Sequence, residues 1–327
     1  MTEPLLSVED LYIRFKTYAG TVHAVNGMSF HIHPGEIFGL VGESGCGKSV
    51  TGLAVLGMVP YPGEVIAGRI LFHGENLLQK NRREMEQIRG GRIAMIFQDP
   101  SASLNPVFTV GSQISRIIRH HRRVDRHEAR ALALAGFEAV GLPDPARIFR
   151  AYPHELSGGM QQRVMIAMAL ASGAELLIAD EPTTALDVTI QAQILALLND
   201  LRAAQGVSIL LITHDLGVVA ETCDRVGVAY AGSIVETGPT AQVLYQMKHP
   251  YTRGLLEALP RPSHRGKALQ SIPGSVPSGL DLPSGCPFWP RCPEVMDICR
   301  EQKPLPTRLD EVGHRVACHL YSREGQR

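Results

Sequence analysis

The segment from Gly42 to Ser49, GESGCGKS, carries residues whose types and spacing suit the binding of phosphate. It fits G-x-x-x-x-G-K-[ST] and follows an apolar run, Ile37–Val41, that predicts a buried strand. Glycines let backbone N–H groups turn toward a phosphate, and the next helix presents its positive N-terminal end. We expect Lys48 to neutralise β- and γ-phosphate oxygens and the Ser49 hydroxyl to bind Mg²⁺. The predicted ATP-binding residues of this loop are Gly42, Glu43, Ser44, Gly45, Cys46, Gly47, Lys48, Ser49 and Val50.

Two adjacent acids, Asp180 and Glu181, follow the continuously apolar run 176–179. Successive side chains of an extended chain point in opposite directions, so the two carboxylates can do different work. Asp180 is predicted to hold Mg²⁺ through water, and Glu181 to act as the general base on the attacking water. Such a base contributes roughly 10²–10⁴-fold. The structural alternative is that either acid merely caps the next turn.

The elements around these motifs alternate short apolar runs with amphipathic ones, which predicts an α/β domain with a largely parallel sheet. Besides 37–41, strands are expected at 92–97, 176–179 and 208–213. A helix after Asp187 is indicated by apolar residues at helical spacing, with Asp187 as N-cap and Gly206 as stop. Helix formers dominate between residues 98 and 156, which predicts an inserted helical subdomain.

Composition excludes several functional classes. The chain has 327 residues, and its 32 basic and 32 acidic side chains cancel, so a general attraction for nucleic acid is not expected. The basic run 116–130 has no interleaved aromatics and is interpreted as a solvated helical face. The N-terminus lacks the basic start and apolar stretch of a secretory signal, and no run is long enough to span a bilayer. We therefore expect a cytoplasmic protein.

Prolines crowd the sequence after about residue 250, which predicts a separate, loop-rich extension. This extension holds four of the six cysteines, and four thiolates suit tetrahedral Zn²⁺ or an iron–sulfur cluster. The absence of a close C-x₂-C pair disfavours zinc, and unligated or disulfide-bonded cysteines are the third alternative. His314 and His319 are candidate substitute ligands, whereas Cys46 and Cys223 are interpreted as small buried residues. The four candidate ligands are Cys286, Cys292, Cys299 and Cys318.

The segment LSGGMQQR, residues 156–163, resembles the signature of the ABC-transporter ATPases. In that family the signature serves the nucleotide held by the opposite subunit of a head-to-tail dimer. The resemblance extends to Gln98 as the Q-loop glutamine that senses Mg²⁺ and water, to Asp187 in the D-loop ALD, and to His214 as the switch histidine on the γ-phosphate. It implies an aromatic residue stacked on the adenine, either Tyr18, which we favour, or Phe15. The signature residues are Leu156, Ser157, Gly158, Gly159 and Met160.

Within these ATPases the chain closely resembles the subunits of oligopeptide and dipeptide importers. The resemblance is carried by IFQDPSASLNP, ADEPTTALDVTIQAQIL, HPYTRGLLEALP and GCPFWPRCP, and covers nearly the whole length. It implies an ATPase domain at 1–258, with the helical subdomain at about 101–172, and an extension at 259–327. Because matching cysteines hold a [4Fe–4S] cluster in some family members, it ranks that cluster ahead of Zn²⁺. Nickel and other metal-chelate importers share much of the pattern.

The resemblance also implies partners: a second ATPase subunit, expected to be a paralogue, two transmembrane permeases and an extracytoplasmic solute-binding protein. The chain would then be a peripheral protein on the cytoplasmic face of the inner membrane. The opposing hypotheses are a soluble ABC ATPase of DNA repair or translation and a subunit with a dead ATPase site. One phosphate loop without a heptad array argues against the former. The presence of both Glu181 and His214 argues against the latter.

Overall fold

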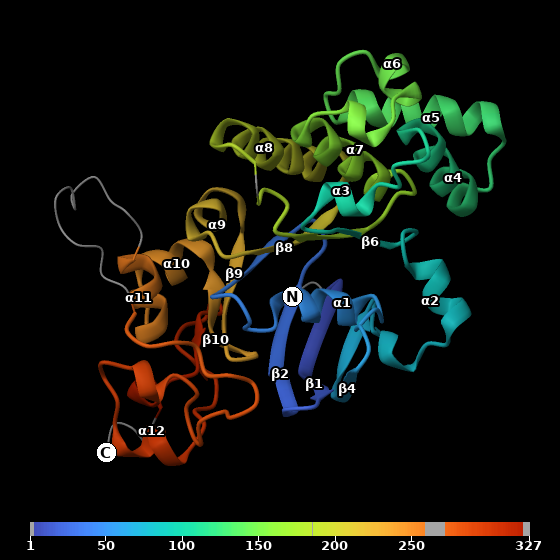
Figure 1. Ribbon diagram of the computed structural model, residues 1–327. Helices are drawn as coiled ribbons and strands as arrows, with labels where there is room; N and C mark the ends of the chain where they lie inside the picture. The colour runs from blue at the N-terminus through green and yellow to red at the C-terminus, as the bar shows by residue number, and fades with distance from the viewer. Residues whose placement is uncertain (1–2, 185, 259–271, 323–327) are drawn as a thin grey trace. The chain divides into compact units, whose positions relative to one another are not determined.

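The computed structural model describes residues 3–184, 186–258 and 272–322 (Figure 1). These residues divide into two compact units. Within these ranges no helix combines the length and the apolar character needed to cross a membrane. The first unit comprises Met1–His33, Ile37–Leu78 and Thr213–Arg327, and the second comprises Pro34–Glu36 and Gln79–Ile212.

The first unit contains an antiparallel sheet in the order β2-β1-β4-β5. Along β1 the side chains of Leu6, Val8, Leu11 and Ile13 are buried, and polar or half-buried residues lie between them. Period-two burial of this kind is what anchors one face of a sheet on a core. The bounds are β1 (Leu6–Thr17), β2 (Gly20–Ile32), β4 (Gly63–Phe72) and β5 (Glu75–Asn76).

The first unit also contains the strand that leads into the phosphate loop. This strand, β3, pairs parallel with β9, and the order continues antiparallel through β10 and β12 to β11. A Cβ at Gly39 would lie 2.9 Å from the Cys223 sulfur, so glycine allows α9 to pack closely on β3. The bounds are β3 (Ile37–Val41), β9 (Arg225–Tyr230), β10 (Ser233–Pro239), β11 (Thr307–Arg308), β12 (Arg315–Val316), α1 (Lys48–Val55), α9 (Leu216–Thr222), α10 (Thr240–Tyr245), α11 (Pro250–Glu257) and α12 (Asp297–Glu301).

The second unit joins a short parallel sheet, in the order β8-β7-β6, to a group of helices. Every residue of β7 and β8 is buried, as expected for strands covered on both faces. The helices α4 and α5 pack on each other, on α6 and on α7. The bounds are β6 (Ile93–Ile96), β7 (Leu176–Asp180), β8 (Ser208–Thr213), α2 (Arg82–Ile88), α3 (Pro100–Ser103), α4 (Val110–Arg122), α5 (Arg126–Ala139), α6 (Pro145–Arg150), α7 (Gly158–Leu170) and α8 (Val188–Gln205).

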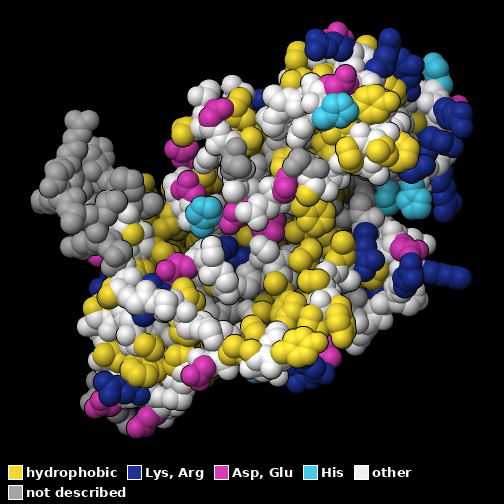
Figure 2. Space-filling view, in the orientation of Figure 1, with side chains coloured by type: hydrophobic (Ala, Val, Ile, Leu, Met, Phe, Trp, Pro, Cys, Tyr) yellow, Lys and Arg dark blue, Asp and Glu magenta, His cyan; other side chains and the backbone are white. Residues whose placement is uncertain are grey.

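The α/β class is confirmed, and each of the four predicted strands is present. The helix predicted after Asp187 is α8, capped by Asp187 at its N-terminus and ended by Gly206 with φ 70°. The predicted basic run lies on α4 and α5, where Arg116, Arg119 and Arg130 are exposed. In Figure 2 the basic and histidine side chains gather over these helices. The predicted boundary between the ATPase domain and the extension, at 258/259, coincides with the start of residues 259–271, which lie outside the described ranges. Residues 323–327 of the predicted extension also lie outside them.

Candidate functional site

The phosphate loop runs from the end of β3 to the start of α1, where the sequence predicted it. Gly42, Gly45 and Gly47 all have positive φ, at 152°, 83° and 88°. A Cβ would lie 2.2 Å from the Ala229 carbonyl oxygen at Gly42, and 2.4 Å from the Ala24 carbonyl oxygen at Gly47. These two glycines are therefore required both by their backbone conformation and by close packing.

Lys48 is held inside the loop that precedes it. Its side chain is buried, and Nζ donates to the carbonyl oxygens of Gly42 at 2.8 Å and Glu43 at 3.0 Å. A buried ammonium needs such acceptors because its charge is otherwise poorly solvated. Cys46 is also buried, and burial raises the pKa of its thiol despite the neighbouring Lys48, which suits the predicted filler role. The ammonium is thus fixed beside the turn that would surround a phosphate.

The two aromatic candidates for the adenine differ in environment. Tyr18 lies between β1 and β2 and is fully exposed. Phe15 lies within β1, and its ring packs on Gly63, where an added Cβ would come 2.7 Å from Phe15 Cε1. A base can stack only on a ring whose face is accessible, so this geometry favours Tyr18.

In the second unit, β7 ends at the predicted acidic pair. Asp180 is buried, whereas Glu181 is half-buried and has a φ of 47°, in the left-handed region that costs a non-glycine residue free energy. Gln98 Nε2 donates to Glu181 Oε2 at 3.0 Å, and Thr184 Oγ1 donates to the same oxygen at 2.8 Å. The unit thus brings two of the predicted site residues, Gln98 and Glu181, into contact, and it adds Thr184, which the sequence did not single out.

The signature opens α7. Ser157 is the N-cap and accepts from the Met160 N–H at 3.4 Å, so Gly158 and Gly159 form the first turn. A Cβ at Gly159 would lie 3.0 Å from Ile190 Cγ2, which leaves little room for a larger residue. Asp187 caps α8 by accepting from the Ile190 N–H at 2.9 Å. Ala185, the first residue of the predicted D-loop, lies outside the described residues.

His214 follows β8 directly and is exposed in the first unit. The next residue, Asp215, caps α9 by accepting from the Gly217 N–H at 2.7 Å. Of the predicted site residues, the phosphate loop, Tyr18 and His214 belong to the first unit. The second unit contains Gln98, Leu156, Ser157, Gly158, Gly159, Met160, Asp180, Glu181 and Asp187.

The four cysteines of the extension lie within electrostatic range of one another. Burial, followed by the neighbouring thiolates, raises the pKa of Cys286 to about 11 and that of Cys318 to about 12. Burial also raises the pKa of Cys292, and the Cys299 thiolate adds to this shift. Among the described residues, however, no three His, Cys, Asp or Glu side chains converge into a metal-binding group. Neither His314 nor His319 completes one: His314 contacts Glu236, and His319 contacts the Gln302 carbonyl.

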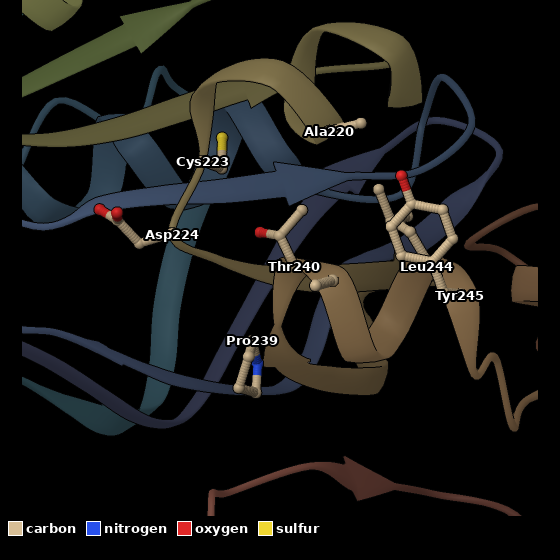
Figure 3. Close-up of a pocket in the computed structure, with 8 residues that line it drawn as sticks. Ala220, Cys223, Asp224, Pro239, Thr240, Leu244 and Tyr245 are labelled. Carbon is tan, nitrogen blue, oxygen red and sulfur yellow. The ribbon is translucent and has the colours of Figure 1, made fainter.

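Two hollows on the first unit contain no phosphate-loop residue in their lining. The one in Figure 3 has a volume of about 250 Å³ and is lined by residues of α9, α10 and their neighbours, including Cys223, Thr240 and Tyr245. It contains none of the predicted site residues. The other, of about 610 Å³, lies between α11 and the extension and includes Cys292 in its lining.

Comparison with known proteins identifies the family. The chain matches the ABC transporter family over residues 25–184, and the oligopeptide/dipeptide transporter C-terminal region over residues 235–299. It is 48% identical to the dipeptide transport ATP-binding protein DppD of Bacillus subtilis (strain 168), covering 99% of this chain and 97% of that protein. The chain belongs to the ABC-transporter ATPases, in their oligopeptide/dipeptide branch.

Another member of this family and a solved structure support the same family assignment. The oligopeptide transport ATP-binding protein OppD of Salmonella typhimurium (strain LT2) is 49% identical, covering 92% of this chain and 90% of that one. A solved dimeric ATP-binding cassette in a post-hydrolysis state, bound to ADP and Pi, is 26% identical and superposes with a TM-score of 0.64. The superposition covers 72% of this chain and 98% of the solved cassette. The chain is therefore an ABC ATPase, and the family resemblance stated from its motifs is confirmed.

Proposed function

We propose that this chain is one of two ATPase subunits that power the import of dipeptides or oligopeptides through a pair of membrane permeases. The observation that carries this proposal is similarity along the whole chain, including the C-terminal region, to proteins named for dipeptide and oligopeptide transport. A solute-binding protein would deliver the peptide. The chain would lie on the cytoplasmic face of the inner membrane as a peripheral subunit, as a subunit that delivers ATP-driven motion to membrane permeases requires.

The phosphate loop is proposed to bind ATP, with Lys48 facing the β- and γ-phosphates and Tyr18 stacking on the adenine. Ser49, Asp180 and Gln98 are the residues that would hold Mg²⁺, and their hydroxyl, carboxylate and amide oxygens are donors that this hard cation prefers. When bound, the cation supplies neutralisation of the charge on the transferred phosphate. The roles of the loop residues rest on their spacing and on the loop conformation described above.

Glu181 is proposed to polarise the attacking water. Two donors on its Oε2, from Gln98 and Thr184, fix the plane of the carboxylate, which supports a positioned base rather than a freely rotating acid. His214 is proposed to contact the γ-phosphate. Fixed groups of this kind lower the reorganisation needed during the reaction.

The signature residues, 156–160, are proposed to act on the nucleotide of the partner ATPase, with Asp187 at the dimer interface. The first turn of α7 supports this role, since two glycines at a helix N-terminus expose backbone N–H groups to an anion. Since peptide importers commonly pair two different ATPases, we propose a paralogue as the partner.

The cysteines of the extension are proposed to hold a [4Fe–4S] cluster, with Zn²⁺ as the alternative. The donor set suits such a cluster in type and number, since four thiols occur in this proline-rich segment. They do not converge in the described structure, so the side chains would have to rearrange. When bound, the group supplies a crosslink for a segment with little regular structure.

Protein purified without oxygen should therefore contain about four irons and four sulfides per chain. Cys292→Ser should abolish this content and make the extension more sensitive to protease, because a thiolate ligand is lost. Cys223→Ala, at a buried cysteine on α9's C-terminal side, is the control that should keep the iron. Stoichiometric zinc without iron in the parent protein would decide for the alternative.

The transport function is tested by ATP hydrolysis in the assembled transporter. Hydrolysis should rise when the solute-binding protein is loaded with a dipeptide or oligopeptide. A nickel chelate is the matched comparison, because metal-chelate importers share much of the sequence pattern.

A further inference from the structure

The side chain of Arg291, in the extension, contacts the phosphate loop. This side chain is almost fully buried, at 4% exposure, and its two terminal nitrogens contact the Glu43 carboxylate. Nη1 lies 2.8 Å from Oε2 and Nη2 lies 3.1 Å from Oε1. Such two-point pairing fixes the orientation of both groups more firmly than a single contact does. Arg291 and Glu43 are 248 residues apart in sequence.

Arg291 is itself held in place by contacts with Pro273 and Tyr230. Its Nε donates to the Pro273 carbonyl oxygen at 3.0 Å, and its guanidinium lies 5.8 Å from the centre of the Tyr230 ring. Nη1 also donates to the Tyr230 hydroxyl at 3.4 Å. The arginine is therefore pre-oriented by other contacts, so pairing with Glu43 costs it little side-chain entropy.

The backbone of Glu43 is fixed as well. Its N–H donates to the hydroxyl of Tyr251, on α11, at 3.0 Å, and its carbonyl oxygen accepts from Lys48. The Tyr251 ring packs on Tyr230, with ring centres 4.6 Å apart, and on Phe288 of the extension, at 5.4 Å. Thus the side chain, N–H and C=O of this one loop residue are all held, and two of the three contacts come from the C-terminal part of the chain.

A second contact of the extension lies on β2, which follows the turn with Tyr18. The His23 N–H donates to the Gly279 carbonyl oxygen at 2.8 Å. Lys303 Nζ donates to the Asn26 carbonyl oxygen at 2.8 Å. The extension therefore also contacts the strand that follows the turn with Tyr18.

An acidic residue in an anion-binding loop needs a physical explanation. The Glu43 carboxylate belongs to the turn whose carbonyl oxygens hold the Lys48 ammonium, so an unpaired charge there would repel the triphosphate and attract the lysine away from it. The Arg291 guanidinium cancels that charge and holds the carboxylate toward the extension. Because the pair is partly buried, solvent and salt screen it only weakly.

We propose that Arg291 is a positioning residue of the ATP site: by neutralising and orienting Glu43, it sets the affinity of the phosphate loop for nucleotide from the C-terminal extension. This inference rests on the proposed ATP site in the loop. It makes the extension part of the ATPase machinery, in addition to any cluster that its cysteines hold.

The proposal is tested by equilibrium titration of the full-length chain with a fluorescent ATP analogue and Mg²⁺. Arg291→Met should raise the dissociation constant about tenfold, because it leaves an uncompensated carboxylate beside the phosphates. In a Glu43→Gln background the same Arg291→Met change should cost no more than about twofold, since no carboxylate remains to be neutralised. Arg291→Lys, which keeps the charge without the two-point geometry, should fall between the parent and Arg291→Met.

The matched control is Arg300→Met, at an exposed arginine of the extension whose guanidinium lies over the Trp289 ring. It should bind the analogue as the parent does. Equal losses from Arg291→Met in both backgrounds, or no loss in either, would overturn the proposal, because Arg291 would then act without Glu43 or not at all. Thermal melts of each variant separate lost affinity from lost folding. If the parent chain itself failed to bind the analogue, the ATP site would be at fault and not the role of Arg291.

Discussion

Lys48→Ala should raise the dissociation constant for ATP by about a hundredfold or more. The ammonium is buried and held by the Gly42 and Glu43 carbonyl oxygens, so it lies beside the turn proposed to enclose the β- and γ-phosphates. Among the described residues, no second cationic side chain donates to these two carbonyl oxygens. Removing it should leave the anion facing carbonyl oxygens and the loop N–H groups alone.

The loss should be measured by the same nucleotide titration, with thermal melts to confirm that the variant is folded. Lys248→Ala, at a half-buried lysine before α11, is the control and should retain binding. Unchanged affinity in folded Lys48→Ala protein would mean that the loop is not the phosphate site.

Glu181→Gln should lower ATP turnover by at least about a hundredfold while leaving ATP bound. Glutamine has the same shape, and its carbonyl oxygen can still accept from Gln98 and Thr184, so the strained backbone at φ 47° and its contacts should persist. The change removes the basic oxygen that would accept a proton from water. Bound ATP should therefore accumulate in the assembled transporter.

Turnover and retained nucleotide should be measured in the same preparation. Glu175→Gln is the matched control: Glu175 lies just before β7 and pairs with Arg92 at 2.6 Å on the surface, so its loss should not slow hydrolysis. Parent-like turnover in Glu181→Gln would assign the base to another group.

Much of the fold follows from local sequence signals. The strands β3 and β8 have the predicted bounds because continuous apolar runs with abrupt polar ends leave little choice of register. The α8 ends were predicted because Asp187 and Gly206 are strong cap residues. The antiparallel strand β1 was not predicted, because bulges between Val8 and Leu11 and beyond interrupt its alternation of buried and exposed residues.

In the candidate site, too, some features could be predicted from the sequence and others could not. Motifs of neighbouring residues, such as the phosphate loop and the acidic pair, were visible because their chemistry depends on local spacing. The contacts of Arg291 and Tyr251 with Glu43 were not, since they join segments far apart in the chain and no periodicity marks them. Their only sequence signal is that both residues lie within segments that resemble peptide importers.

The central claim, that this chain couples ATP hydrolysis to peptide import, is tested most directly in lipid vesicles containing the chain, its partner ATPase and both permeases. ATP hydrolysis and uptake of a labelled dipeptide should be measured together, with and without the solute-binding protein. We predict that the peptide-loaded binding protein raises hydrolysis well above the basal rate and that labelled peptide accumulates on the ATP side, while a nickel chelate does neither. An ATP hydrolysis rate that does not change when peptide-loaded binding protein is added, or that rises only with the chelate, would contradict the account.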